Sequence, residues 1–219
     1  MHNLGLAEQL HYCAIGAERV FLDLAADRYF SLPAKAGDAF RALEEGVAMG
    51  PDDAGVALLV REGILVDHDR GKPILATRNY PPTESLVETI GVRANISLRA
   101  MAEALCLVAF ARHGVRAKRL PRLLARLSHR APRRAALICG RDLAVARFCR
   151  VRPLVPIRPN CLYDSIALTR FLHRRGIAAT LAIGVKLHPF AAHAWVQDGA
   201  TVLNDSLGHA RDFQPVLFI

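Results

Sequence analysis

Three short stretches near the end of the chain decide its fold: Pro159-Asn-Cys-Leu-Tyr-Asp-Ser165, Ala192-His-Ala-Trp-Val196 and Leu203-Asn-Asp205. Asn160 is a favourable helix N-cap, so the first stretch predicts a helix from Cys161 to about Arg175. A thiol in the first turn lies at the positive end of the helix dipole, which favours the thiolate. The other two stretches are predicted strands. A thiol, an imidazole and a carboxylate in this order suit a nucleophile, its base and the group that orients the base.

The register between the two strands decides which residue faces His193. Asp198-Gly199 signals a hairpin turn between them. A two-residue turn would place His193 opposite Asn204, whereas a three-residue loop would place it opposite Asp205, because a slip of one residue changes the face. We choose Asp205 as the orienting residue, since a carboxylate also stabilises an imidazolium. Asn204 is the alternative orienting residue.

Charge is unevenly distributed along this chain of 219 residues, which is 52% apolar and has a net charge of +9. Residues 1–75 hold seven Lys and Arg against twelve Asp and Glu, whereas residues 112–152 hold thirteen against Asp142 alone. We interpret the basic segment first as a solvated helix surface, and second as a dock for an acidic partner or substrate. Nucleic acid ranks last, because Phe148 is the only aromatic residue there to stack on a base.

Neither a metal site nor a disulfide framework is indicated by the cysteines, which number five and include no C-x-x-C pair. All except Cys161 are interpreted as small apolar residues, buried or half-buried: Cys13, Cys106, Cys139 and Cys149. No phosphate-binding loop motif is present, so we expect no cofactor. The longest apolar stretch, residues 96–110, carries Arg99 and Glu103 and is too short to span a membrane. With no signal peptide pattern either, a cytoplasmic location is expected.

The pattern of short strands and helices in residues 1–75 predicts a small winged-helix-like domain. Its predicted strands are Leu10–Ile15, Arg19–Asp23, Arg28–Leu32 and Ile64–Val66, and its predicted helices are Lys35–Glu45 and one that begins at Pro51. The negative charge of this domain argues against DNA binding. Residues 76–92 have the composition of a linker. Residues 93–219 form the second predicted domain, with further helices over 95–113, 121–128 and 134–150 before Cys161, so the fold class is α+β.

The first domain resembles the peptide-recognition element of modified-peptide biosynthesis, similar to the peptide chaperone of the pyrroloquinoline-quinone pathway. The resemblance lies in Val20-Phe-Leu-Asp23, Arg28-Tyr-Phe-Ser-Leu-Pro33 and Val60-Arg-Glu-Gly-Ile-Leu65. It implies that a leader peptide adds as a strand beside residues 28–32, against the second helix. The expected contacts are Arg28, Tyr29, Phe30, Leu32, Val56 and Val60. Tyr29 and Phe30 point to opposite faces, so only one of them can line the groove, and core packing is an equal alternative for both.

The second domain resembles the transglutaminase-like cysteine proteases, and in particular the leader peptidases of lasso-peptide pathways. The residues that carry the resemblance are Asn160-Cys-Leu-Tyr-Asp-Ser165, Ala182-Ile-Gly-Val185 and Ala192-His-Ala-Trp-Val196. It implies that Cys161 is the nucleophile, His193 the general base and acid, and Asp205 the orienting residue. The expected supporting residues are Asn160, Trp195 and Asn204, with the Cys161 backbone N–H as an oxyanion donor.

Together the two resemblances imply a leader peptidase of lasso-peptide maturation. Its partners would be the leader segment of a precursor peptide and a lasso cyclase of the asparagine-synthetase-like type, with no nucleic acid and no membrane span. Two other functions stay open: an acyltransferase or transglutaminase that uses the same cysteine, and a non-catalytic chaperone that binds the leader for the cyclase. A DNA-binding regulator is a distant third.

Overall fold

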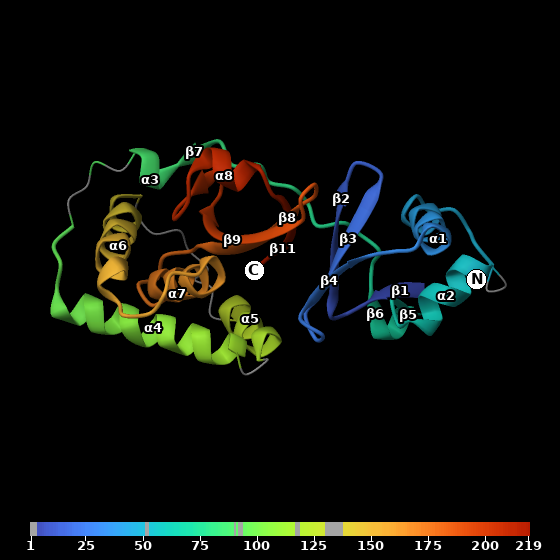
Figure 1. The fold of residues 1–219 in the computed structure, drawn as a ribbon, viewed down its shortest axis with the longest axis horizontal. Coiled ribbons are helices and arrows are strands. Elements are labelled where there is room, and N and C mark those ends of the chain that lie inside the picture. The colour runs from blue at the N-terminus through green and yellow to red at the C-terminus, as the bar shows by residue number, and fades with distance from the viewer. Residues whose placement is uncertain (1–3, 51–52, 90, 92–93, 117–118, 130–137) are drawn as a thin grey trace. The chain divides into compact units, whose positions relative to one another are not determined.

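The computed structural model describes residues 4–50, 53–89, 91, 94–116, 119–129 and 138–219. Contacts divide the chain into two compact units, Met1–Arg78 and Asn79–Ile219 (Figure 1). Each unit combines helices with antiparallel strands, as the α+β prediction requires. No helix in the described ranges is long and apolar enough to cross a membrane.

The first unit is built on two small sheets. One is a meander of β2 (Leu10–Ile15), β3 (Glu18–Asp23) and β4 (Arg28–Ser31), so β4 is an edge strand. In the other, β1 (Leu4–Ala7) lies between β5 (Leu65–Asp67) and β6 (Gly71–Lys72). The helical elements are α1 (Ala34–Glu44), α2 (Ala54–Arg61) and the 3-10 turn η1 (His68–Arg70). The predicted strands and the first helix are present, and the helix predicted to begin at Pro51 is α2, which begins at Ala54, while residues 51–52 lie outside the described ranges. Strand β1 is an addition that the four-residue pattern was too short to predict.

Three aromatic rings form the centre of the first unit. Tyr12 stacks on Phe21 with ring centroids 5.3 Å apart, and Phe40 from α1 packs edge-on against both at 5.0 Å. The strand register supports this cluster, since Tyr12 lies opposite Phe21 and Phe21 lies opposite Phe30. The rings therefore fix α1 onto one face of the meander.

The second unit contains a five-stranded sheet in the order β11-β8-β9-β10-β7. The strands are β7 (Glu84–Ser85), β8 (Thr180–Lys186), β9 (Ala191–Asp198), β10 (Thr201–Val202) and β11 (Gln214–Phe218). The helices are α3 (Leu86–Thr89), α4 (Leu98–Arg116), α5 (Leu120–His129), α6 (Ile138–Val151), α7 (Cys161–His173) and α8 (Leu207–Arg211), with the 3-10 turn η2 (Arg152–Leu154).

Helix α7 lies at the centre of the second unit. It contacts α4, α6 and strand β9, and Figure 1 shows it between α4 and the sheet. Ile166, Leu168 and Phe171 are fully buried on this helix. Ser165 to Thr169, Phe171 and Leu172 are all buried, and this packing holds the helix N-terminus in one place.

Two predicted helix boundaries are corrected. The helix expected over residues 95–113 is α4, which begins at Leu98 and continues through Gly114 to Arg116. Gly114 does not end the helix, because its role is close packing: a Cβ there would clash with the Leu123 side chain of α5. Of the helix expected over 134–150, residues 134–137 lie outside the described ranges, and α6 begins at Ile138.

The segment expected as a linker is largely part of the second unit. Within residues 76–92, β7 pairs in parallel with β10, and the Thr83 backbone N–H donates to the Ala200 carbonyl at 2.8 Å. The Arg211 guanidinium also donates to the Pro82 carbonyl at 2.9 Å. Pro and Gly content indicated a flexible connection, but strand pairing to the edge of the sheet holds residues 79–89 in place.

Candidate active site

The N-terminus of α7 carries Cys161, where the sequence predicted it. The Asn160 side-chain oxygen accepts hydrogen bonds from the backbone N–H groups of Leu162 (3.1 Å) and Tyr163 (3.2 Å), so Asn160 is the helix N-cap. Cys161 is partly exposed, which leaves its thiol accessible at the positive end of the helix.

The thiol of Cys161 differs chemically from the buried cysteines. A hydrogen bond with the His193 ring, helped by one from the backbone of Ala194, outweighs burial and lowers the pKa of the Cys161 thiol. In contrast, burial raises the pKa of Cys13 to about 12 and that of Cys149 to about 11. Of these three cysteines, Cys161 is therefore the one whose surroundings favour the thiolate. Cys106 is exposed on α4, which corrects its interpretation as a buried apolar residue, and the Cys139 side chain lies outside the described part of the chain.

His193 from β9 lies between the thiol and a carboxylate. Its Nε2 is 2.5 Å from Oδ2 of Asp205, so Nδ1 is the nitrogen left for Cys161. Burial by itself would lower the pKa of His193, but hydrogen bonds to Asp205 and Cys161 outweigh it and raise the pKa to about 9. Burial would likewise raise the pKa of Asp205, but the bond from His193 and the Ser206 backbone N–H (2.8 Å) lower it below its usual value. The arrangement favours the state in which Asp205 is a carboxylate, His193 an imidazolium and Cys161 a thiolate.

Asp205 reaches His193 by a route that differs from both predicted turns. Asp198 pairs with Thr201 and Gln197 with Val202, so both predicted registers are wrong. Strand β10 then ends at Val202, and the chain leaves the sheet before Asp205. The His193–Asp205 contact is present because the chain turns back toward β9, and the two residues are not cross-strand partners.

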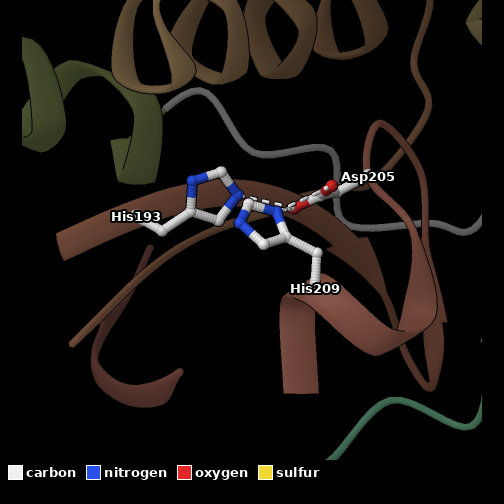
Figure 2. A group of neighbouring side chains, drawn as sticks. All are labelled: His193, Asp205 and His209. Atoms are coloured by element: carbon white, nitrogen blue, oxygen red, sulfur yellow. Dashed lines mark hydrogen bonds and ion pairs between the residues drawn. The ribbon is translucent and has the colours of Figure 1, made fainter. Parts of the chain in front are cut away.

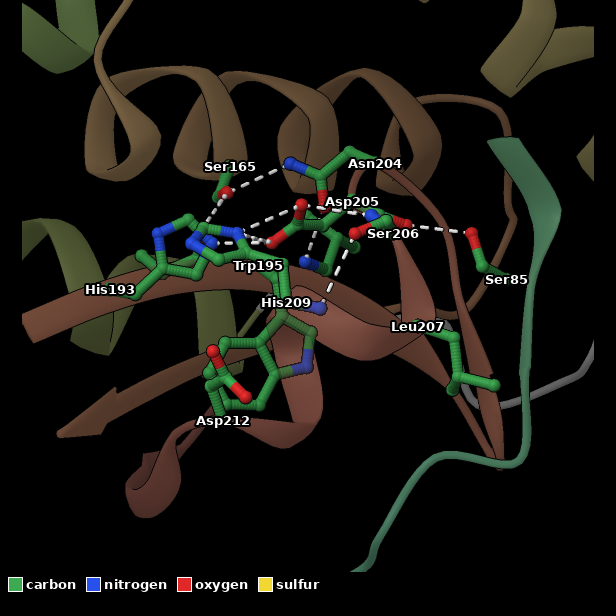
Figure 3. Close-up of polar contacts among 12 residues, drawn as sticks. Ser85, Ser165, His193, Trp195, Asn204, Asp205, Ser206, Leu207, His209 and Asp212 are labelled. Atoms are coloured by element: carbon green, nitrogen blue, oxygen red, sulfur yellow. Dashed lines mark hydrogen bonds and ion pairs between the residues drawn. The ribbon is translucent and has the colours of Figure 1, made fainter. Parts of the chain in front are cut away.

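Asn204 joins this turn to the neighbouring elements, since its side chain bonds to Val196 and Ser165 and not to His193 in the described part of the chain. Its side-chain oxygen accepts from the Val196 backbone N–H at 2.7 Å, and its Nδ2 donates to the Ser165 hydroxyl at 2.9 Å (Figure 3). Ser165, buried on α7, donates in turn to the Ala194 carbonyl at 3.0 Å. This network ties α7, β9 and the turn together, and the sequence reasoning missed Ser165. A polar residue on an otherwise buried helix face was the available signal.

Trp195 covers the site from the same face of β9 as His193. Its ring is fully buried and lies nearly parallel to the imidazole, with centroids 6.1 Å apart. Gly184, opposite His193 on β8, makes room for it, because a Cβ there would come within 2.8 Å of the Trp195 ring. The Trp195 indole N–H donates to Gln197 at 3.1 Å, which satisfies its one polar group.

His209 is a second imidazole at this site and was not among the residues predicted from the sequence. Its Nδ1 lies 2.9 Å from Oδ2 of Asp205, and its ring centroid is 4.4 Å from that of His193. Figure 2 shows both rings directed at the same carboxylate. Phe213 packs edge-on against His209 at 5.3 Å. The i, i+4 spacing from Asp205 to His209 on a short helical turn was the only sequence signal for this contact.

These three side chains also have the donor types of a transition-metal site. The ligand atoms of His193, Asp205 and His209 all lie within 4.8 Å of one another. The hydrogen bonds between the two imidazoles and the carboxylate account for this proximity without an ion.

A model of the transglutaminase-like superfamily matches residues 98–218, which is more than half of the chain. The chain belongs to the transglutaminase-like superfamily. The fold expected for its second part is thereby confirmed, and α7, β8 and β9 are elements of the transglutaminase-like domain.

One curated relative shares a shorter segment with this chain. It is the microcin J25-processing protein McjB of Escherichia coli, 47% identical over 49 residues, which are 22% of this chain and 24% of that protein. The match thus spans about a quarter of the relative's length. No solved structure gives a significant match.

A buried ion pair supports the start of α7 in the transglutaminase-like domain. The Arg152 guanidinium donates to Asp164 at 2.7 Å and to the Ile157 carbonyl at 3.0 Å. Asp164 also accepts from the Asn160 backbone N–H at 3.3 Å. The ion pair holds the segment that leads into Cys161 against the start of α7. This structural role accounts for Asp164, three residues after the thiol.

The first unit has a groove of about 310 Å³ between β4 and α2. Of the six residues expected to contact a leader peptide, three line it: Arg28, Phe30 and Leu32. Tyr29 lies on the other face of β4, as the alternation of the strand predicts. Two expectations are corrected, because Val56 is only 2% exposed and belongs to the core, whereas Val60 is 45% exposed and lies outside the groove. Leu58 and Leu59 are the α2 residues that line it, together with Glu62 at the C-cap of that helix.

Proposed function

We propose that this chain is a cysteine peptidase in which Cys161 is the nucleophile, His193 the general base and acid, and Asp205 the orienting residue. The observation that carries the proposal is the series of thiol, imidazole and carboxylate, with His193 Nε2 2.5 Å from Asp205 and the pKa of Cys161 lowered by its bond to His193. Membership of the transglutaminase-like superfamily supports acyl chemistry at a cysteine.

In the proposed mechanism the Cys161 thiolate attacks the carbonyl carbon of a peptide bond. The imidazolium of His193 then gives its proton to the leaving amine as the C–N bond breaks, which leaves a thioester on the enzyme. Neutral His193 next takes a proton from water as the water oxygen attacks the thioester, and the C–S bond breaks to release the carboxylic acid and restore the Cys161 thiolate and the His193 imidazolium. Asp205 holds the ring and stabilises its charged form throughout.

The backbone N–H of Cys161 is the proposed donor to the oxyanion that forms at the attacked carbonyl. The Asn160 cap binds the next two N–H groups, those of Leu162 and Tyr163, and does not use that of Cys161. The cap also uses only the oxygen of the Asn160 side chain, so its Nδ2 is proposed as a second donor.

The proposed substrate is the precursor of a lasso peptide, cleaved between leader and core. The curated relative is a processing protein for microcin J25, and the segment shared with it supports a substrate of this class. We propose that the first unit recognises the leader, which would add as a strand to the free edge of β4 with its side chains in the groove at Phe30 and Leu32. A lasso cyclase in the cytoplasm would take the released core peptide.

Mass spectrometry of a candidate lasso precursor peptide, incubated with the protein, tests the proposal. Wild type should cleave a single junction, and Cys161→Ala should bind the leader without cleaving it. Cys106→Ala is the matched control, because it removes an exposed thiol on α4 and should leave cleavage unchanged. Amide or crosslinked products in the presence of amines would indicate the acyltransferase alternative. Leader binding without cleavage by wild type, even with the cyclase added, would leave the chaperone alternative.

A further inference from the structure

Four arginines line a hollow in the second unit. It has a volume of about 590 Å³, and its charged and polar lining residues are Ser97, Arg99, Glu103, Arg147, Arg174 and Arg175. They come from the segment that opens α4, from α6 and from the end of α7. Cys161 lies at the other end of α7, about 20 Å away along the helix axis at 1.5 Å per residue. The hollow is therefore separate from the candidate active site.

Charge in this hollow is not balanced, since four guanidinium groups share one carboxylate. Glu103 pairs with Arg174 at 3.1 Å and with Arg175 at 2.6 Å. Arg175 is held further by a bond to the Phe171 carbonyl (2.8 Å) and lies 3.4 Å above the Phe171 ring. The Glu103 carboxylate offsets one of the four positive charges, so the side chains that line the hollow carry three positive charges in excess.

One N–H donor of the Arg147 side chain, which comes from α6, has no hydrogen-bond partner in the described part of the chain. This donor is Nε, which is buried away from solvent. Buried N–H groups in proteins are almost always hydrogen-bonded, and those of a charged guanidinium most of all. An acceptor from outside the chain would satisfy this donor, and it would have to be negatively charged to suit the surroundings.

The first turn of α4 adds to the positive potential. Ser97 and Ala100 line the hollow, and the Ser97 hydroxyl accepts from the Ala100 backbone N–H at 3.2 Å, so the N-terminus of this 19-residue helix opens there. The dipole of a helix places partial positive charge at this end.

We propose that this hollow binds a small molecule bearing a phosphate group. Guanidinium groups match the oxygens of phosphate through pairs of parallel N–H···O bonds, and Arg99 and Arg147 are available for this role. A dianion would offset most of the excess charge. The volume exceeds what one phosphate group needs, which leaves room for the organic part of a phosphate ester. This site is independent of peptide hydrolysis by Cys161.

Thermal unfolding and calorimetry of the full chain test the site, with inorganic phosphate and pyrophosphate as probes and sodium chloride at matched ionic strength as the reference. Both probes should raise the unfolding temperature of wild type in a saturable way. Arg147→Met should unfold in buffer at a temperature equal to or above that of wild type, because it removes an unsatisfied buried donor, and it should weaken phosphate binding by about tenfold.

Arg99→Gln provides a second variant on the exposed first turn of α4, and it should also weaken phosphate binding. Arg150→Gln is the matched control, because it removes the same charge from α6 at an exposed position outside the hollow. Equal stabilisation of all four proteins, or none of wild type, would overturn the proposal. Binding of poly-glutamate but not of phosphate would also overturn it, and would assign the hollow to an acidic protein segment.

Discussion

At the scale of single residues, the proposed chemistry depends on how three ionisable groups of the candidate site share protons. The hydrogen bond from His193 lowers the pKa of Cys161, while its bonds to Asp205 and Cys161 raise the pKa of His193 to about 9. Between these two pKa values the pair is a thiolate and an imidazolium. Below the pKa of Cys161 its thiol is protonated, and above about pH 9 the His193 imidazolium loses its proton.

Alkylation by iodoacetamide should therefore begin at a lower pH at Cys161 than at an ordinary thiol. The rate at Cys161 should rise below pH 9, with a second increase near pH 9 as His193 deprotonates and the free thiolate becomes the stronger nucleophile. His193→Ala should move the first rise to higher pH, because burial then dominates. Peptide mapping separates the sites, and the exposed Cys106 is the internal control. Identical profiles for wild type and His193→Ala would exclude the ion pair.

His209 should act as a positioning residue for Asp205. Loss of its hydrogen bond in His209→Ala should lower kcat for precursor cleavage by about two- to tenfold with little change in KM, because one net hydrogen bond is lost. His209→Asn places an N–H donor where Nδ1 lies and should recover most of the rate. A purely structural role predicts instead that both variants fail together and that unfolding temperature falls in parallel with activity.

At the scale of elements, the hairpin of β8 and β9 and the buried helix α7 hold the side chains of the candidate site together. The Ser165 and Asn204 bonds join α7 to the turn that carries Asp205, while Gly184 admits the Trp195 ring beside His193. The site is thus fixed by packing between elements, since no single element carries more than one of its reacting groups.

Gly184→Ala should destabilise the protein by about 1–3 kcal/mol, because the new methyl group would overlap the Trp195 ring and crowd Phe213. Displacement of Trp195 should also slow alkylation of Cys161. Gly208→Ala in α8 is the matched control, since a Cβ there meets no atom within 4 Å. Urea unfolding of the two variants provides the comparison, and equal stabilities would contradict the packing role of Gly184.

At the scale of the whole molecule, the two units divide the proposed work between recognition and cleavage. The free edge of β4 and the groove beside it lie in the first unit, and the thiol lies in the second. Docking of a leader on one unit would raise the local concentration of its cleavage junction at the other, so that a modest peptidase becomes selective.

Phe30→Ala should weaken leader binding by about tenfold, because it removes an aromatic ring that lines the groove. KM for precursor cleavage should rise to the same extent while kcat stays unchanged, since the chemical groups are untouched. Val60→Ala, at an exposed position on α2 outside the groove, should leave both constants at wild-type values. A fall in kcat for Phe30→Ala would argue against separate recognition and cleavage.

The sequence by itself determined the features that depend on local propensity. Asn160 caps a helix because its side chain is suited to the free N–H groups there, and the strands of the first unit follow from apolar alternation and turn residues such as Gly16. The order of Cys161 and His193 on a helix and a strand could likewise be predicted from short patterns. Each of these depends on residues that are neighbours in the chain.

Only the tertiary structure decided which side chains meet. The contact of His193 with Asp205 was predicted, but through a register that the hairpin does not adopt, because turn geometry and the early end of β10 are set by packing. His209 and the arginines around the hollow were not identified as groups, since they come together from turns and helix ends that local patterns do not position. Contacts between residues distant in sequence depend on how the elements pack, and local pattern carries no information about that.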